Sequence, residues 1–213
     1  MKISRIGIVS VFIILFSVSC RSGEDMSAYF DEGRIENNIY ISDSTGLKMM
    51  IPEGWKPVLK MNKKDEGRVR EKLDNMEVSV APFIRLISLE KDKYNRFRSG
   101  HEIFERIDKK KELREDLMAD RELISYVFPP PVKIIAVNPI IRETIDSIDF
   151  LTFSYECFLP SPINKKLYGI TYVGIVRNKF LFITINYTDL ENRKEIMDAW
   201  LNSTFDKSKW RRY

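Results

Sequence analysis

The sequence predicts an α/β fold of the α+β type, with a central antiparallel sheet and helices packed on it. Residues 148–158 alternate between apolar and polar side chains, which is typical of a half-buried strand. Residues 167–176 and 180–187 are two further strand-like runs joined by a short link, which favours an antiparallel hairpin. Helices are expected over residues 102–127, where apolar side chains are interspersed among charged ones, and after Thr188.

Two short strands are expected near the start of the domain. Residues 38–42 and 47–51 are rich in β-favouring side chains, and the turn-forming residues 43–46 separate them. Pro52-Glu53-Gly54 closes the second strand, because proline and glycine both favour turns. Residues 83–89 predict a third strand.

Helical spacing occurs in two charged stretches and near the C-terminus. Residues 60–74 predict a short amphipathic helix. The expected helix over residues 102–127 ends at Pro129-Pro130-Pro131, because proline lacks the amide proton that a helix requires. A last helix is expected with Thr188 as its N-cap and Glu191 as the capping-box partner. Its apolar side is formed by Ile196, Met197, Trp200 and Leu201.

The first twenty residues have the order of a bacterial secretory leader. Lys2 and Arg5 form a positive n-region, residues 6–16 form an apolar h-region, and residues 17–19 place small side chains before Cys20. A helix that spans a bilayer takes about 20 apolar residues. The apolar run is shorter than that, and we therefore expect the leader to be removed.

The junction Ser17-Val18-Ser19-Cys20 resembles the lipobox of bacterial lipoproteins, in which the cysteine is acylated and becomes the mature N-terminus. The resemblance implies that Cys20 carries acyl chains such as palmitate and anchors the protein to a membrane of the cell envelope. Ser17 departs from the lipobox, which usually has leucine there, and Ser17 with Ser19 also fits ordinary signal peptidase. A soluble secreted or periplasmic protein is therefore the alternative, and an uncleaved anchor is the third.

These features divide the chain into four parts. Residues 1–19 are the expected signal peptide, and residues 20–37 are a polar, lipid-anchored tether. Residues 38–206 are expected to form a single α/β domain, which is long enough to bury a core without covalent cross-links. Residues 207–213 form a basic tail.

Charge and cysteine content exclude several classes of protein. The formal charge is +4 and falls to +2 without Lys2 and Arg5 of the leader, which is too balanced for nucleic-acid binding. The chain has two cysteines, so a lipid on Cys20 leaves Cys157 without a disulfide partner. The chain has one histidine, which excludes a histidine-rich metal site, and no cofactor motif such as a glycine-rich phosphate loop occurs.

The segment Tyr40–Trp55, YISDSTGLKMMIPEGW, resembles the opening of PsbP-like domains. Those domains begin with a strand, a glycine turn, a second strand and a Pro-x-Gly-Trp closure. They end with a strand hairpin, a polar turn and a C-terminal helix, as this sequence does. The resemblance implies a central antiparallel sheet with helices packed on it. It also implies a binding or assembly module, and it supplies no catalytic residue to transfer.

Two residues are candidates for chemistry, and a structural role is favoured for both. His101 has the side chain of a general base, but its charged neighbours favour a solvated position at the start of a helix. Cys157 would be a nucleophile if a positive neighbour lowered its pKa. Strand alternation instead places Cys157 on the core face with Leu151, Phe153 and Tyr155.

The candidates for binding are aromatic or basic. Trp55 either plugs the end of the sheet or lines a surface groove, and burial is favoured because tryptophan is usually buried. Phe128, next to three prolines, either presents a ledge to a partner or simply ends a helix. The run Lys109-Lys110-Lys111 either touches anionic lipid headgroups or forms a solvated helix face.

These motifs contain no catalytic or metal-binding constellation. We therefore expect a non-enzymatic binding or assembly module near an envelope membrane, which binds a partner protein or an apolar ligand and no nucleic acid. The alternative is a secreted or anchored hydrolase with an unrecognised site. That alternative requires His101 or a carboxylate pair in a cleft, with His101 hydrogen-bonded to a serine or an aspartate.

Overall fold

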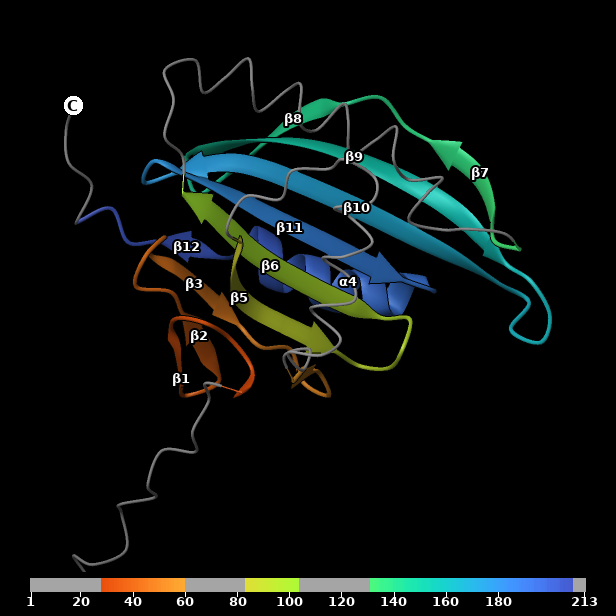
Figure 1. Ribbon diagram of the computed structural model, residues 1–213, viewed down its shortest axis with the longest axis horizontal. Coiled ribbons are helices and arrows are strands. Elements are labelled where there is room, and N and C mark those ends of the chain that lie inside the picture. The colour runs from red at the N-terminus through yellow and green to blue at the C-terminus, as the bar shows by residue number, and fades with distance from the viewer. Residues whose placement is uncertain (1–27, 60–82, 104–130, 209–213) are drawn as a thin grey trace, which may run out of the picture.

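The computed structural model describes residues 28–59, 83–103 and 131–208, which form two antiparallel sheets and one helix (Figure 1). The large sheet has eight strands: β4 (Lys56–Pro57), β5 (Phe83–Glu90), β6 (Arg96–Ile103), β7 (Lys133–Val137), β8 (Ile141–Ile145), β9 (Ile148–Leu159), β10 (Lys165–Val176) and β11 (Lys179–Tyr187). The small sheet has four strands: β1 (Arg34–Glu36), β2 (Ile39–Ile41), β3 (Leu47–Met50) and β12 (Thr204–Phe205). The helix α4 spans Leu190–Leu201.

The large sheet has the order β4-β5-β6-β11-β10-β9-β7, and β8 also pairs with β9. Its three longest strands, β9 to β11, are those predicted from alternation and the hairpin link. The β10–β11 hairpin turns at Arg177 and Asn178, whose φ angles of 51° and 61° are those of a type I′ turn. Asn37-Asn38 and Asp146-Ser147 also have positive φ angles in the β1–β2 and β8–β9 hairpins.

Helix α4 and the small sheet cover one face of the large sheet, the rear face in Figure 1. The core on this face is centred on Trp200 of α4, which is fully buried. Its indole ring contacts aromatic rings from both sheets: Phe97, Phe150, Tyr172 and Phe205. Large aromatic side chains bury the most apolar area per residue, so this cluster holds the helix and both sheets together.

A second apolar cluster occupies the opposite face of the large sheet, over β9, β10 and β11. Its buried members are Phe153, Tyr155, Cys157, Leu159, Leu167, Val173 and Phe180. Cys157 is fully buried there, as the alternation predicted. Tyr155 packs directly over Gly169, where an added Cβ would lie 2.0 Å from the tyrosine Cζ. The glycine is therefore required for this close approach.

Arg177 ties the small sheet to the large one. Its guanidinium donates a hydrogen bond of 2.9 Å to the carbonyl of Asp43 and another to the carbonyl of Asp206. Gly46 lies between these partners with a φ of 77°, and a Cβ there would lie 2.7 Å from Nη2 of Arg177. Both the left-handed backbone and the lack of space require glycine at this position.

The α/β class with helices packed on the sheet is wrong, because the described residues are mostly strand and contain a single helix. Glu102 and Ile103, expected to open a charged helix, belong to strand β6. Residues 133–137 and 141–145, where no element was expected, form β7 and β8. The rest of the expected helix over residues 102–127, and the one over residues 60–74, lie outside the described residues.

The C-terminal helix forms as predicted, but its N-cap is one residue later. The Asp189 carboxylate, not Thr188, accepts a hydrogen bond of 2.8 Å from the amide of Asn192. This bond is the main cause that holds the pKa of Asp189 below its usual value. Leu201, expected on the apolar side, is 46% exposed.

The folded part of the chain begins before residue 38, the boundary expected from the sequence. The buried Phe30 ring lies 5.4 Å from the ring of Tyr40, and β1 pairs with β2. The expected leader and Cys20 lie outside the described residues. In the ranges that the structure describes, no helix is long and apolar enough to cross a membrane.

Candidate functional site

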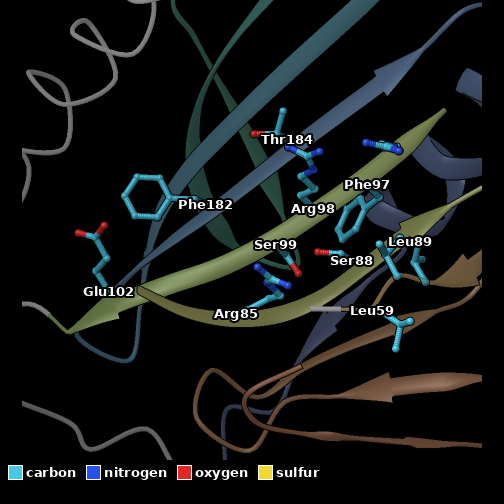
Figure 2. Close-up of a pocket in the computed structure, with 12 residues that line it drawn as sticks. Leu59, Arg85, Ser88, Leu89, Phe97, Arg98, Ser99, Glu102, Phe182 and Thr184 are labelled. Atoms are coloured by element: carbon cyan, nitrogen blue, oxygen red, sulfur yellow. The ribbon is translucent and has the colours of Figure 1, made fainter. Parts of the chain in front are cut away.

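A cavity of about 640 Å³ opens on the face of the large sheet opposite to α4 (Figure 2). Its walls come from β5, β6 and β11 and from the two residues that follow β4. The side chains that line it are charged, hydroxylated or apolar: Val58, Leu59, Arg85, Ser88, Arg96, Arg98, Glu102, Phe182 and Thr184. Sites for small molecules typically have volumes of about 300–1,000 Å³, and this cavity lies in that range.

The pairing register of three neighbouring strands brings the polar side chains together. Arg98 of β6 pairs with Ser88 of β5 on one side and with Thr184 of β11 on the other. Residues directly opposite one another in antiparallel strands project from the same face. These three side chains therefore form one row across the cavity, and Figure 2 shows Arg98 beside Thr184.

The adjacent row contains a gap. Gly100 lies between Arg85 of β5 and Phe182 of β11, and it contributes no side chain to the face. The gap leaves space between the arginine and the aromatic ring. The remaining lining residues have buried side chains: Leu89, Phe97 and Ser99.

Three arginines, Arg85, Arg96 and Arg98, give the cavity a positive charge. Arg98 is exposed overall, but the pKa of its guanidinium is lowered. Partial desolvation is the larger cause, and the charge of Arg96 is the second. Arg96 forms an ion pair of 3.3 Å with Glu90, and its buried Nε has no hydrogen-bond partner among the described residues. Guanidinium groups bind carboxylates and phosphates through two parallel hydrogen bonds, so this arrangement suits an anionic group.

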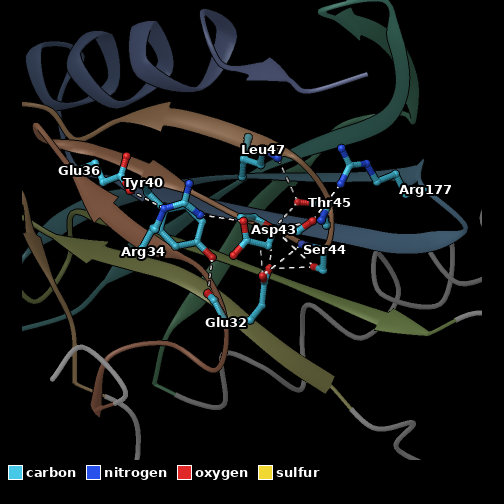
Figure 3. A network of polar contacts seen from close by, with 10 residues as sticks. Glu32, Arg34, Glu36, Tyr40, Asp43, Ser44, Thr45, Leu47 and Arg177 are labelled. Carbon is cyan, nitrogen blue, oxygen red and sulfur yellow. Dashed lines mark hydrogen bonds and ion pairs between the residues drawn. The ribbon is translucent and has the colours of Figure 1, made fainter. Parts of the chain in front are cut away.

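His101 lies on the opposite face of β6, where it contacts Ser44. Ser44 belongs to a hydrogen-bond network around Glu32 (Figure 3). His101 is 2% exposed, so the predicted solvated position at the start of a helix is wrong. Its Nε2 lies 2.9 Å from Oγ of Ser44, and Ser44 donates a hydrogen bond of 2.8 Å to Glu32. His101 is not among the residues that line the cavity.

The direction of these hydrogen bonds is unsuited to nucleophilic catalysis. A serine has one hydroxyl hydrogen, and Ser44 gives it to the Glu32 carboxylate. The Nε2 of His101 must then donate to Ser44, so the nitrogen that would act as the base already carries a proton. Burial, followed by the charge of Lys179, lowers the pKa of His101 to about 4, which leaves the imidazole neutral. Its Nδ1 has no partner in the described ranges that would orient the ring.

Trp55 and Cys157 are not among the residues that line the cavity. Trp55 is 4% exposed, and its indole N–H donates a hydrogen bond of 2.9 Å to Glu195, so it plugs the core as favoured. Burial is the main cause that raises the pKa of Cys157 to about 11, so the thiol is neither accessible nor ionised. Cys20, Phe128 and residues 109–111 lie outside the described residues.

The cavity arginines were not identified from the sequence, although one signal was present. Arg96 and Arg98 alternate with the buried Phe97 and Ser99, which places two guanidinium groups on one face of a strand. Only the pairing register brings Arg85 beside them. Within the described ranges, no group of three or more His, Cys, Asp or Glu residues is arranged to hold a metal ion.

No protein-family model matches this chain, and no curated protein matches it. The fold is similar to the solution structure of cyanobacterial PsbP (CyanoP) from Synechocystis sp. PCC 6803, with a TM-score of 0.51. The similarity covers 78% of this chain and 91% of that chain, at 10% sequence identity. Likeness at this identity concerns the fold and not the activity. The chain therefore has a PsbP-like fold, as the segment Tyr40–Trp55 suggested.

Proposed function

We propose that this chain is a non-enzymatic binding module of a bacterial cell envelope, anchored to a membrane by lipid at Cys20. The observation that carries the binding role is the cavity, where side chains from three strands converge on a preformed hollow. The PsbP-like resemblance supports the same role, because PsbP-like domains serve mainly as binding or assembly modules. The lipobox-like junction supports the anchor, and a soluble secreted or periplasmic form is the alternative.

Native mass spectrometry of the chain purified from its envelope tests the binding role. We expect a bound small molecule in the wild type. Ser88→Trp fills the cavity and should abolish the adduct, whereas Ser208→Trp, at an exposed position outside the lining, should retain it. A wild type without an adduct, or an adduct that persists in Ser88→Trp, would contradict the proposal.

The anchor has a separate test. Cys20→Ala should remove the mass of the acyl chains, and it should either leave the precursor unprocessed by the lipoprotein peptidase or release the protein from the membrane fraction. Ser22→Ala, two residues further on, is the matched control and should change neither the mass nor the membrane fraction. An unchanged mass and an unchanged membrane fraction in Cys20→Ala would exclude lipid attachment at this residue.

A hydrolase is the second candidate, because Ser44 and His101 lie within hydrogen-bond distance. A fluorophosphonate reagent labels serines that are activated by a neighbouring base. We expect no labelling that depends on Ser44, since its hydrogen is donated to Glu32. Labelling of the wild type that disappears in Ser44→Ala would establish an enzyme and refute the non-enzymatic assignment.

A further inference from the structure

We infer that the cavity binds a small amphiphile through a phosphate or carboxylate group, with Arg98 as the central contact and Arg85 and Arg96 beside it. The inference rests on the proposed binding function and names the class of ligand. It follows from three features of the described residues: the charge of the lining, the hydroxyl groups around Arg98, and the apolar walls on either side.

The lining has a net positive charge. Three arginines line the cavity, and Glu102 is the carboxylate among the described lining residues. Arg96 pairs with Glu90, but among the described residues none forms a hydrogen bond or an ion pair with the guanidinium of Arg85 or of Arg98. Like charges on neighbouring strands repel one another, and an oxyanion bound among them would remove that repulsion.

The hydroxyl groups near Arg98 complete an oxyanion site. Ser88 and Thr184 flank Arg98 in the same row of the sheet. Each hydroxyl donates one hydrogen bond, and a guanidinium donates two in parallel to a planar carboxylate or to a phosphate. Both side chains are partly exposed, so their donors are accessible from the cavity.

Apolar groups form other parts of the cavity wall. Val58 and Leu59 lie on the side of β4, and the ring of Phe182 lies on the side of β11. Leu59 is 62% exposed and is therefore available for contact with a ligand. A cavity of this volume suits a small molecule, and apolar walls around a few fixed polar groups favour one with an apolar portion.

Isothermal titration of the full chain with octyl phosphate and with octyl glucoside tests the inference. The two probes share an alkyl chain, and only the first carries the oxyanion. We expect octyl phosphate to bind at least about tenfold more tightly, and its affinity to fall as salt is added. Octanoate, which carries a carboxylate on a similar chain, should bind at the same site.

Arg98→Met is the central variant, because it keeps most of the side-chain length and removes the charge. It should weaken octyl phosphate binding by at least about tenfold, whereas Arg98→Lys should weaken it less, since lysine retains the charge but not the fork geometry. The matched control is Arg142→Met on β8, an exposed arginine outside the lining. It should leave the affinity unchanged. The melting temperature of each variant verifies that it is folded.

The outcomes separate this inference from the proposed function. Equal affinity for the two octyl probes, or an Arg98→Met variant that binds like Arg142→Met, would overturn the anionic assignment and leave the cavity as a binding site. Failure of every probe to bind the folded wild type would overturn both. Dihexanoyl phosphatidylglycerol and inorganic phosphate distinguish the two sources of the anion. Tighter binding of the first indicates a lipid headgroup, and equal binding indicates a free phosphate compound.

Discussion

The indole N–H of Trp55 donates a hydrogen bond of 2.9 Å to Oε2 of Glu195, which joins the turn after β3 to helix α4. Lys91 donates to the same carboxylate at 2.8 Å. Both hydrogen bonds lower the pKa of Glu195, and the bond from Lys91 has the larger effect. The tryptophan of the Pro-Glu-Gly-Trp closure is therefore held by a residue far along the chain.

Glu195→Gln should lower stability at neutral pH and have little effect in acid. A carboxylate whose pKa is lowered on folding stabilises the protein above its unfolded pKa, and the contribution is lost as the pH falls through the folded pKa. We expect the melting temperature at about pH 7 to fall by roughly 1–3 °C, and the difference to vanish near pH 2–3. Glu53→Gln in the exposed turn is the control, and an equal deficit at both pH values would argue against this account.

His101 should make the protein less stable as the pH falls from about 6.5 to about 4. Because the folded pKa is lowered, the unfolded chain binds a proton more readily in this range, so the free energy of unfolding decreases by roughly 3 kcal/mol. Urea unfolding of the wild type and of His101→Gln at several pH values isolates this component. The sole imidazole in the chain should titrate near 4 by NMR, and a midpoint near 6.5 in the folded protein would be incompatible with burial.

Gly169→Ala should destabilise the protein by about 3 kcal/mol, because the new methyl group would overlap the ring of Tyr155. The effect depends on that ring. In a Tyr155→Leu background, the same substitution should cost less than about 1 kcal/mol. Urea unfolding of the two single variants and the double variant gives the coupling energy. Additive effects would mean that the two residues do not interact.

Cys157 should resist thiol reagents in the folded protein. The side chain is fully buried, and desolvation raises the pKa of the thiol to about 11. In a Cys20→Ser background, where it is the only thiol, Cys157 should react with Ellman's reagent slowly under native conditions and rapidly in guanidinium chloride. Fast reaction in the native state would place this part of β9 in contact with solvent.

The sequence predicted strand β9, whose two faces differ, and did not predict strand β6, whose faces do not. Residues 148–158 alternate cleanly, so β9 was expected. In β6, polar side chains occupy both faces, because Ser99 and His101 lie on the core side opposite Arg96 and Arg98. Period-two hydrophobicity is absent from such a strand, so no strand was predicted there.

Turn chemistry explains a second miss. The β8–β9 hairpin turns at Asp146 and Ser147, and both have positive φ angles without a glycine. A turn signal that relies on glycine does not detect this pair, so β8 was overlooked.

The cavity could not be predicted from the sequence. Its arginines meet only through strand pairing, and that pairing includes a register shift between Arg85 and Ser88 of β5.

The small sheet is completed by both ends of the folded unit. Strand β3 pairs with its neighbour β2 on one side and with β12, the last strand, on the other. A nascent chain therefore exposes one edge of β3 until β12 has left the ribosome. The bonds from Arg177 to Asp43 and Asp206 also form late, since Arg177 and Asp206 both follow β3 by a long stretch of chain. Strand β3 is thus synthesised early and gains its second partner strand late.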